Sequence, residues 1–292
     1  MNNKINNPLL VRDELPLFSK IEPKHISPAI DLILKENKEI ISQIENFSEE
    51  LLWENFIEPL QRCDERLSRA WSQVNHLNAV VNNQDLRNKY NENFLKITNY
   101  YSEISQNEII YKKFKALKQS SVYEYFTDAK KKVVDDELLG FELGGVDLPN
   151  NKKEEFKKIK EELSSLTSKF EENILDATNN FQLHITDPIK IRGLPQDIIA
   201  MVKNNAEQKN LDGWLFTLDF PCYVPTLQYA DDRLLRKDMY KAYATKASDL
   251  GDSLLDNTKN INDILTLKYK LAKMLNYSDY ASMSLKTKMA KS

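Results

Sequence analysis

The side chains that could hold a catalytic metal are few and widely spaced in this sequence. A zincin-type metalloprotease needs two histidines four residues apart on one helix, with a glutamate beside the first that acts on the zinc-bound water. The chain has three histidines, His25, His76 and His184, which are 51 and 108 residues apart, and none is followed by Glu. The sequence therefore predicts no catalytic and no metal-ligating residue among these 292 residues.

Nucleophilic catalysis by cysteine is also disfavoured. Cys63 and His76 lie thirteen residues apart on one predicted helix, which separates them by about 20 Å at a rise of about 1.5 Å per residue. Cys63 occupies a core position, where a free cysteine is usually inert packing. No residue near Cys222 indicates a base. We expect His76 to be a capped or hydrogen-bonded structural residue and His184 to be an exposed strand residue.

The remaining motifs favour structural roles. The segment "GFELGG" has neither the G-x-G-x-x-G spacing of a phosphate-binding loop nor a following Lys-Ser/Thr. Adjacent carboxylates on amphipathic helices are usually solvated faces or helix caps. These pairs are Asp135-Asp136, Glu154-Glu155, Glu171-Glu172 and Asp231-Asp232. An aromatic set at helical spacing is interpreted as core: Trp71, Tyr90, Phe94, Tyr100 and Tyr101. Which residues bind substrate stays undetermined from the sequence.

Composition narrows the class of protein. The charges, 41 basic against 44 acidic residues, are mixed along the chain, which argues against a nucleic-acid or membrane-surface partner. No apolar run approaches the roughly 18 residues of a membrane span, and the first residues lack the pattern of a secretory signal. Two cysteines form no disulfide framework. We therefore expect a cytoplasmic protein.

Long helices must position whatever site exists. Apolar residues recur every three or four positions over residues 26–47, 53–81 and 86–104, with Asn37 interrupting the first series and Pro59 marking a first turn or kink in the second. Shorter helices are expected near 110–117 and 129–139. The clearest helix runs from Phe156 to Phe181, with Glu and Lys on its other face, as in an antiparallel bundle.

The pattern changes near residue 181. The segments "FQLHITDP" and "GWLFTLDFPCYVPTLQYA" alternate with period two and predict strands, with Pro221 and Pro225 confining the second to an edge or a break. A helix between them is expected to start at Pro195. Asp231 and Asp232 are candidate N-caps of the next helix. Another apolar series, from Ile261 to Leu275, predicts a further helix.

The fold class expected is mostly α: a long antiparallel helical bundle with a small β element near residues 181–229. We expect one N-terminal helical lobe over residues 1–292, with a possible weak boundary near Asn150. The last residues, "YASMSLKTKMAKS", predict a helix that includes Tyr280, Met283, Leu285 and Met289, without the Gly or Asn that usually ends one.

A series of segments in fixed order carries a family resemblance. They are "NPLL", "LPLFSKIEPKHISPAI", "WSQVNHLNAVVNN", "LGFELGGVDLP", "LSSLTSKFEENILDAT", "GLPQDIIA", "FTLDFPCYVP", "LRKDMYKAYATKASDLG" and "ILTLKYKLAKMLNYSDYASMSLKTKMA". Together they resemble the N-terminal part of the thimet-oligopeptidase family of zinc metallopeptidases, from Asn7 to Ala290. The resemblance implies two mostly helical lobes around a deep channel that admits short peptides, with zinc bound by a His-Glu-x-x-His helix.

That zinc helix has no counterpart in this chain, so no family site residue is carried over. The resemblance implies the N-terminal lobe of the peptidase, a wall of its channel, with the catalytic part missing. We expect no cofactor in this chain, zinc in the complete enzyme, short peptides and the missing catalytic part as partners, and no hydrolysis by this chain alone. Two alternatives are a self-standing helical peptide-binding or adaptor module and one half of a split peptidase.

Overall fold

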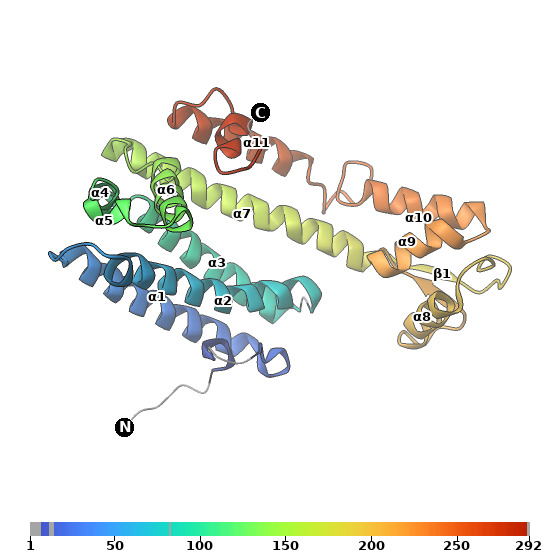
Figure 1. Ribbon diagram of the computed structural model, residues 1–292. Helices are drawn as coiled ribbons and strands as arrows, with labels where there is room; N and C mark the ends of the chain where they lie inside the picture. The colour runs from blue at the N-terminus through green and yellow to red at the C-terminus, as the bar shows by residue number, and fades with distance from the viewer. Residues whose placement is uncertain (1–6, 12–14, 82, 291–292) are drawn as a thin grey trace. The chain divides into compact units, whose positions relative to one another are not determined.

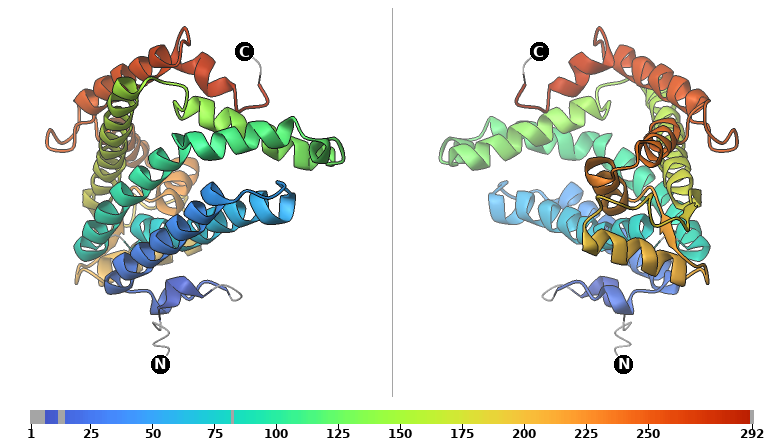
Figure 2. Two further views of the ribbon diagram at one scale, coloured as in Figure 1. Left: turned by 90° about the vertical axis from the view of Figure 1, so that its left-hand side faces the viewer. Right: turned by 90° about the vertical axis from the view of Figure 1, so that its right-hand side faces the viewer.

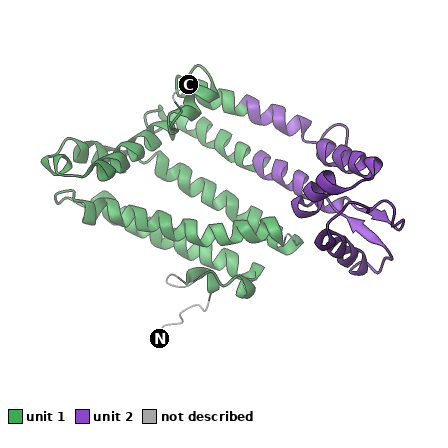
Figure 3. Cartoon of the chain, turned by 45° about the vertical axis from the view of Figure 1, so that its right-hand side comes forward, with its two compact units in different colours: residues 1–165, 267–292 green, residues 166–266 purple. Residues whose placement is uncertain are grey.

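The computed structural model describes residues 7–11, 15–81 and 83–290. It is mostly helical with one small antiparallel sheet, which confirms the expected fold class (Figure 1). Two compact units divide the chain: unit 1 comprises residues 1–165 and 267–292, and unit 2 comprises residues 166–266 (Figure 3). The division falls inside two helices, at residues 165/166 and 266/267. The possible boundary near Asn150 stays a prediction.

Unit 1 contains the long helices that the apolar periodicity predicts. These are α1 (Pro23–Asn46), α2 (Glu58–Val80) and α3 (Gln84–Ser105), followed by α4 (Glu108–Lys118), α5 (Ser121–Glu124) and α6 (Asp128–Leu143). Short 3-10 turns at Pro8–Leu10 and Phe18–Lys20 precede α1, and a π-helical turn at Trp53–Ile57 leads into α2 with Pro59 in its first turn, as predicted. Helices α1, α2 and α3 lie side by side (Figure 2).

The core of unit 1 is filled by aromatic and aliphatic side chains from these helices. Phe56 and Phe114 are fully buried, with ring centroids 4.7 Å apart. Asn37, the polar residue in the apolar series of α1, is 1 % exposed and donates its Nδ2 hydrogen to the carbonyl of Cys63 at 3.0 Å. The amide therefore ties α1 to α2, because a buried polar group must find a partner.

Two helices continue from one unit into the other. Helix α7 spans Asn150–Asn180 and α11 spans Thr258–Met274. Beyond α11, the short helix α12 covers Tyr280–Leu285 only, so the expectation of a helix that includes Met289 is wrong. Met289 is fully exposed, and without apolar burial nothing extends the helix to it. Lys291 and Ser292 lie outside the described residues. Within the described residues, no helix has the length and apolar character to span a bilayer.

Unit 2 is built on a two-stranded sheet. Strand β1 (Leu183–Ile185) pairs antiparallel with β2 (Trp214–Phe216), so that His184 lies opposite Leu215. Helix α8 (Gln196–Glu207) lies between the strands in sequence and begins after Pro195, as predicted. Gly213 precedes β2 with φ +86°, where a Cβ would lie 2.4 Å from the Ile185 carbonyl oxygen. Only glycine fits there without strain.

The predicted second strand is wrong beyond residue 216. Residues Phe220–Tyr229 form helix α9, followed by α10 (Arg233–Thr245). The period-two alternation ends at Phe220, and the buried residues then follow helical spacing: Cys222, Tyr223 and Thr226. Pro221 sits in the first turn, where its missing N–H is not needed, so the proline that argued for an edge strand starts a helix instead.

Candidate functional site

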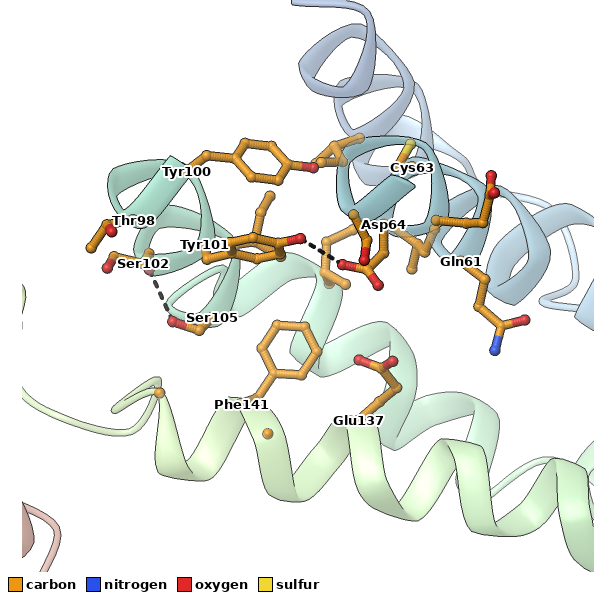
Figure 4. A pocket seen from close by; sticks show the side chains of 18 of the residues that line it. Gln61, Cys63, Asp64, Thr98, Tyr100, Tyr101, Ser102, Ser105, Glu137 and Phe141 are labelled. Atoms are coloured by element: carbon orange, nitrogen blue, oxygen red, sulfur yellow. Dashed lines mark hydrogen bonds between the residues drawn. The ribbon is translucent and has the colours of Figure 1, made fainter. Parts of the chain in front are cut away.

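A cleft of about 940 Å³ opens in unit 1 and is the candidate site (Figure 4). Its walls come mainly from α2, α3 and α6, with Lys160 from the first part of α7. Aromatic rings and charged groups share the lining, including Tyr100 and Tyr101, Phe141, and the carboxylates of Asp64 and Glu137. This mixture of apolar surface and convergent polar groups is typical of a ligand-binding cleft.

Helical spacing explains how charged side chains reach the cleft. Asp64 lies four residues after Leu60 and three before Leu67, and Lys160 lies four after Phe156 and three before Leu163. Residues three and four apart lie on one helix face, so both charges lie on the apolar side of their helices. Glu137 repeats the pattern on α6, between Val134 and Phe141. Charges at apolar-face positions were the signal in the sequence that could have identified these three residues.

The carboxylates of Asp64 and Glu137 face the same space between α2 and α6 (Figure 4). The Tyr101 hydroxyl donates a hydrogen bond to Asp64 Oδ1 at 2.8 Å, which fixes that carboxylate at the α3 side of the cleft. Burial raises the pKa of Tyr100 to about 12, and burial together with Asp64 raises the pKa of Tyr101 further. Both phenols therefore stay protonated at neutral pH, and Tyr101 remains a donor.

Glu137 and Lys160 have no ion-pair or hydrogen-bond partner among the described residues. Both side chains are open to solvent through the cleft while protein surrounds them on other sides. Desolvation, with the nearby charges of Asp64 and Asp136, raises the pKa of Glu137. Desolvation alone lowers the pKa of Lys160. Desolvation thus disfavours the charged form of each group.

The three histidines lie in separate places and take structural roles. His25 accepts a hydrogen bond at Nδ1 from the backbone N–H of Glu22, at 3.0 Å, in the first turn of α1. His76 is exposed on α2 and packs against the ring of Phe18, with centroids 5.2 Å apart, so a ring contact replaces the hydrogen bond expected of it. His184 is exposed on β1, as predicted, with Nε2 at 2.5 Å from the carbonyl of Asp212.

Both cysteines are buried packing residues, at 3 % exposure for Cys63 and 1 % for Cys222. Burial raises the pKa of each thiol, which keeps both sulfurs in the unreactive thiol form. Cys63 and His76 lie on the same helix, α2, as expected. The geometry gives neither cysteine a base.

The acidic pairs serve mainly in ion pairs and caps. Asp135 pairs with Lys118 at 2.7 Å, Asp136 with Lys132, and Glu155 with Lys152 at 3.0 Å. Asp232 caps α10 by accepting from the backbone N–H groups of Leu234 and Leu235 at 2.7 and 2.9 Å, as predicted.

The aromatic set divides into core residues and one cleft residue. Trp71 stacks on Tyr90 and Phe94, with centroids 4.8 and 6.2 Å away, and Tyr100 is buried. Tyr101, which the sequence assigned to the core, is 40 % exposed and faces the cleft instead. Its hydroxyl reaches Asp64, and that polar bond turns the ring away from the apolar interior.

The described residues do not fit a zinc ion. Zinc in proteins takes three or four closely placed His, Cys or carboxylate ligands, and no such group of three occurs in the part of the chain that the structure describes. The three imidazoles also do not converge on one point, because each lies in a different element, α1, α2 or β1.

The class of protein follows from comparison with known families. Residues 30–153 match the N-terminal domain of neurolysin and thimet oligopeptidase, and residues 226–292 match peptidase family M3. The first match contains α2, α3 and α6, so most of the cleft belongs to that domain. The chain belongs to peptidase family M3.

Several similar proteins are oligopeptidases. Oligopeptidase A of Escherichia coli K12 and that of Haemophilus influenzae are each 39 % identical to this chain over 98 % of it. A probable cytosolic oligopeptidase A of Arabidopsis thaliana is 37 % identical over 98 %. The chain spans about 42 % of the length of the two bacterial proteins and 41 % of the plant protein.

Proposed function

We propose that this chain is the N-terminal portion of a cytoplasmic zinc oligopeptidase, in which it forms a wall of the channel and controls the access of short peptides. Two observations support this assignment: the match to an N-terminal domain, and the span of about 42 % of the bacterial relatives. The chain alone does not hydrolyse peptides. The zinc, its ligands and the catalytic residues belong to the remaining part of the family enzyme.

The arrangement of histidines carries the proposal of inactivity. A hydrolytic zinc site needs imidazoles that converge on one point and an open coordination position for water. Here one imidazole caps a helix, one packs on Phe18 and one is exposed on a strand. The described histidines therefore cannot form a hydrolytic zinc site. Peptide hydrolysis depends on a partner that supplies one.

An exposed apolar helix face supports the remaining part of the peptidase as that partner. Ile261, Leu265 and Tyr269 recur every four residues on α11 and are 44 %, 59 % and 52 % exposed. Residues at this spacing form one stripe. The stripe, called here the α11 face, lies in the segment that matches family M3. An exposed apolar stripe usually marks a surface that another protein part covers.

The test is a peptidase assay with and without the remaining part. The purified chain is mixed with a fluorogenic oligopeptide and zinc, first alone and then with the rest of Escherichia coli oligopeptidase A, produced separately. We expect no chelator-sensitive turnover from the chain alone and restored turnover in the mixture. Chelator-sensitive turnover by the chain alone, or no restoration with a folded and zinc-loaded partner, overturns the proposal.

A matched pair of variants tests the role of the α11 face. Leu265→Asp places a charge in the stripe, and Leu95→Asp places the same charge at a 47 % exposed leucine on α3, outside the M3 match. Both sites are exposed, so we expect folding to change by no more than about 0.5 kcal/mol in either. Restored turnover falls about tenfold or more in Leu265→Asp and is unchanged in Leu95→Asp. Equal effects of the two variants contradict a specific role of the face.

A further inference from the structure

One segment of unit 1 has no buried residue of its own. Residues 118–133, between Leu117 on α4 and Val134 on α6, comprise the end of α4, helix α5 and the start of α6, and none of them is buried. This segment is called here the strap. A segment with few buried apolar groups opens locally at a low cost in free energy. The contacts that the strap makes with the rest of unit 1 therefore decide whether it stays in place.

Aromatic and charged contacts hold the strap against the turn that leads into α2. The ring of Phe126 meets the ring of Trp53 edge-on, with centroids 5.8 Å apart and planes at 86°. Lys130 Nζ lies 4.6 Å from the centroid of Trp53, 5.5 Å from that of Phe126 and 4.0 Å from Glu54 Oε1. These four residues are called here the clasp. All four remain partly or largely exposed, so each contact is weak enough to break and form again.

Helices α2 and α6 run in the same direction along the candidate cleft. In Figure 4, Gln61 lies to the right of Asp64 on α2, and Glu137 lies to the right of Phe141 on α6. Both helices therefore begin at the same end of the cleft. Figure 2 shows the connections that precede these helices, between α1 and α2 and between α4 and α6, on one side of unit 1.

The clasp lies at that end of the cleft. Leu60 and Glu137 line the cleft, and Trp53 and Lys130 come seven residues before them in the sequence. Seven residues are two helical turns, which return the chain to the same face about 10 Å further along. The contact between Trp53 and Lys130 thus closes the space between α2 and α6 beyond the residues that line it.

We propose that the strap is a gate at this end of the cleft, closed while Phe126 and Lys130 rest on Trp53 and open in a minor state in which they leave it. Leu117 and Val134 are fully buried and anchor the strap at its two ends, so the opening stays local. A ligand that extends past this end of the cleft needs the open state. The inference rests on unit 1 alone and does not require the proposed function.

Hydrogen exchange of the full chain measures how often the strap opens. The readout is the exchange rate of hydrogen-bonded strap amides, such as those of Tyr125 and Phe126, whose N–H groups donate to the carbonyls of Val122 and Tyr123. We expect Trp53→Ala to raise that rate about tenfold while the rates in α1 and α3 stay unchanged, because the strap loses its aromatic partner. A smaller increase is expected for Trp53→Phe, which keeps a ring.

A matched pair of lysines locates the contact. Lys130→Gln and Lys132→Gln remove the same charge from the same helix, but Lys132 is 70 % exposed and pairs with Asp136 rather than with the clasp. We expect Lys130→Gln to raise strap exchange about three- to tenfold, as expected for the loss of one cation–π contact. Lys132→Gln should change it by less than about twofold. Both lysines lie at partly exposed positions, so these variants keep the test valid if Trp53→Ala does not fold.

Spin labels on both sides of the clasp measure the opening itself. Glu49→Cys and Tyr125→Cys place them at exposed positions, on the connection before α2 and on the strap. The native thiols of Cys63 and Cys222 are 3 % and 1 % exposed, so the introduced cysteines react first. Pulsed electron resonance should show one main distance and a longer minor one. Lys130→Gln should raise the longer population about threefold or more.

Three results overturn the gate. The first is unchanged strap exchange in both Trp53→Ala and Lys130→Gln. The second is equal acceleration by Lys130→Gln and Lys132→Gln, which removes the specific role of the clasp. The third is faster exchange without a longer label distance, which shows fraying in place of opening. None of these results bears on the proposed function, which the restoration of turnover by the catalytic part tests separately.

Discussion

Both units expose large apolar side chains, and unit 1 also contains a cleft lined by charged groups. Unit 1 places charged side chains at positions that helical spacing assigns to the apolar face, and there they line a cleft: Asp64, Glu137 and Lys160. Unit 2 leaves large apolar side chains in solvent, with Leu250 75 % and Leu254 84 % exposed. Charged groups along a cleft suit a small ligand, whereas exposed apolar groups suit a large partner.

Each unit has its own hydrophobic core, and substitutions in these cores are expected to have the largest effect on stability. Phe114 of unit 1 and Phe216 of unit 2 are 1 % and 0 % exposed and belong to separate clusters of buried residues. Phe114→Ala and Phe216→Ala are each expected to cost about 3–5 kcal/mol. Hydrogen exchange is expected to lose protection mainly in α1–α6 for the first variant and in α8–α10 for the second. Equal loss throughout the chain in both variants breaks the division into two cores.

Two glycine-to-alanine substitutions are expected to change the free energy of unfolding by less, and with opposite signs in the two units. Gly213→Ala puts a Cβ 2.4 Å from the Ile185 carbonyl oxygen at φ +86°, and we expect unit 2 to lose about 1–3 kcal/mol. Gly140→Ala lies in helix α6 of unit 1 with nothing within 4 Å. There we expect a gain of about 0.5–1 kcal/mol, because alanine is the better helix former. Denaturant unfolding measures both, and equal signs contradict the backbone argument.

Substitutions of helix N-caps are expected to have the smallest effect on stability. The two units should differ in how that effect depends on pH. Asn83 caps α3 of unit 1 by accepting from the Leu86 N–H at 2.9 Å, and Asn83→Ala is expected to cost about 1 kcal/mol at every pH. Asp232 caps α10 of unit 2, and its bonds from the N–H groups of Leu235 and Leu234 lower its pKa. Its contribution is complete above the ordinary aspartate pKa of roughly 4 and is lost as the pH falls through the lowered folded value.

Asp232→Ala should therefore destabilise unit 2 at neutral pH and lose its effect in acid. Thermal unfolding of both cap variants between neutral and acid pH makes the comparison. A pH-independent effect of Asp232→Ala shows that the carboxylate does not act as the cap.

The sequence predicts unit 1 better than unit 2 for a physical reason. Long helices repeat their apolar spacing over many turns, so α1, α3 and α7 follow from periodicity alone. Residues 214–229 hold a three-residue strand and a ten-residue helix, which are too short for either period to be established, and prolines occur in both. Burial of Cys222, Tyr223 and Thr226 against the rest of unit 2 decides for a helix.

The candidate cleft could be predicted only in part. Asp64, Glu137 and Lys160 each interrupt an apolar face in the printed sequence, as Asn37 does on α1. Spacing alone cannot distinguish a charge that lines a cleft from a polar group that bonds across a core. Asn37 bonds to the Cys63 carbonyl on α2, whereas Glu137 has no such partner among the described residues. Which helices pack together decides between these outcomes, and a local pattern does not contain that information.

Zinc binding by the purified chain tests the central claim most directly. Equilibrium dialysis against zinc at submicromolar free concentration, followed by the peptide assay on the dialysed protein, measures both metal and activity. We expect much less than one zinc per chain and no chelator-sensitive turnover until the catalytic part is added. One tightly bound zinc per chain, together with turnover in the absence of the catalytic part, contradicts the proposed function.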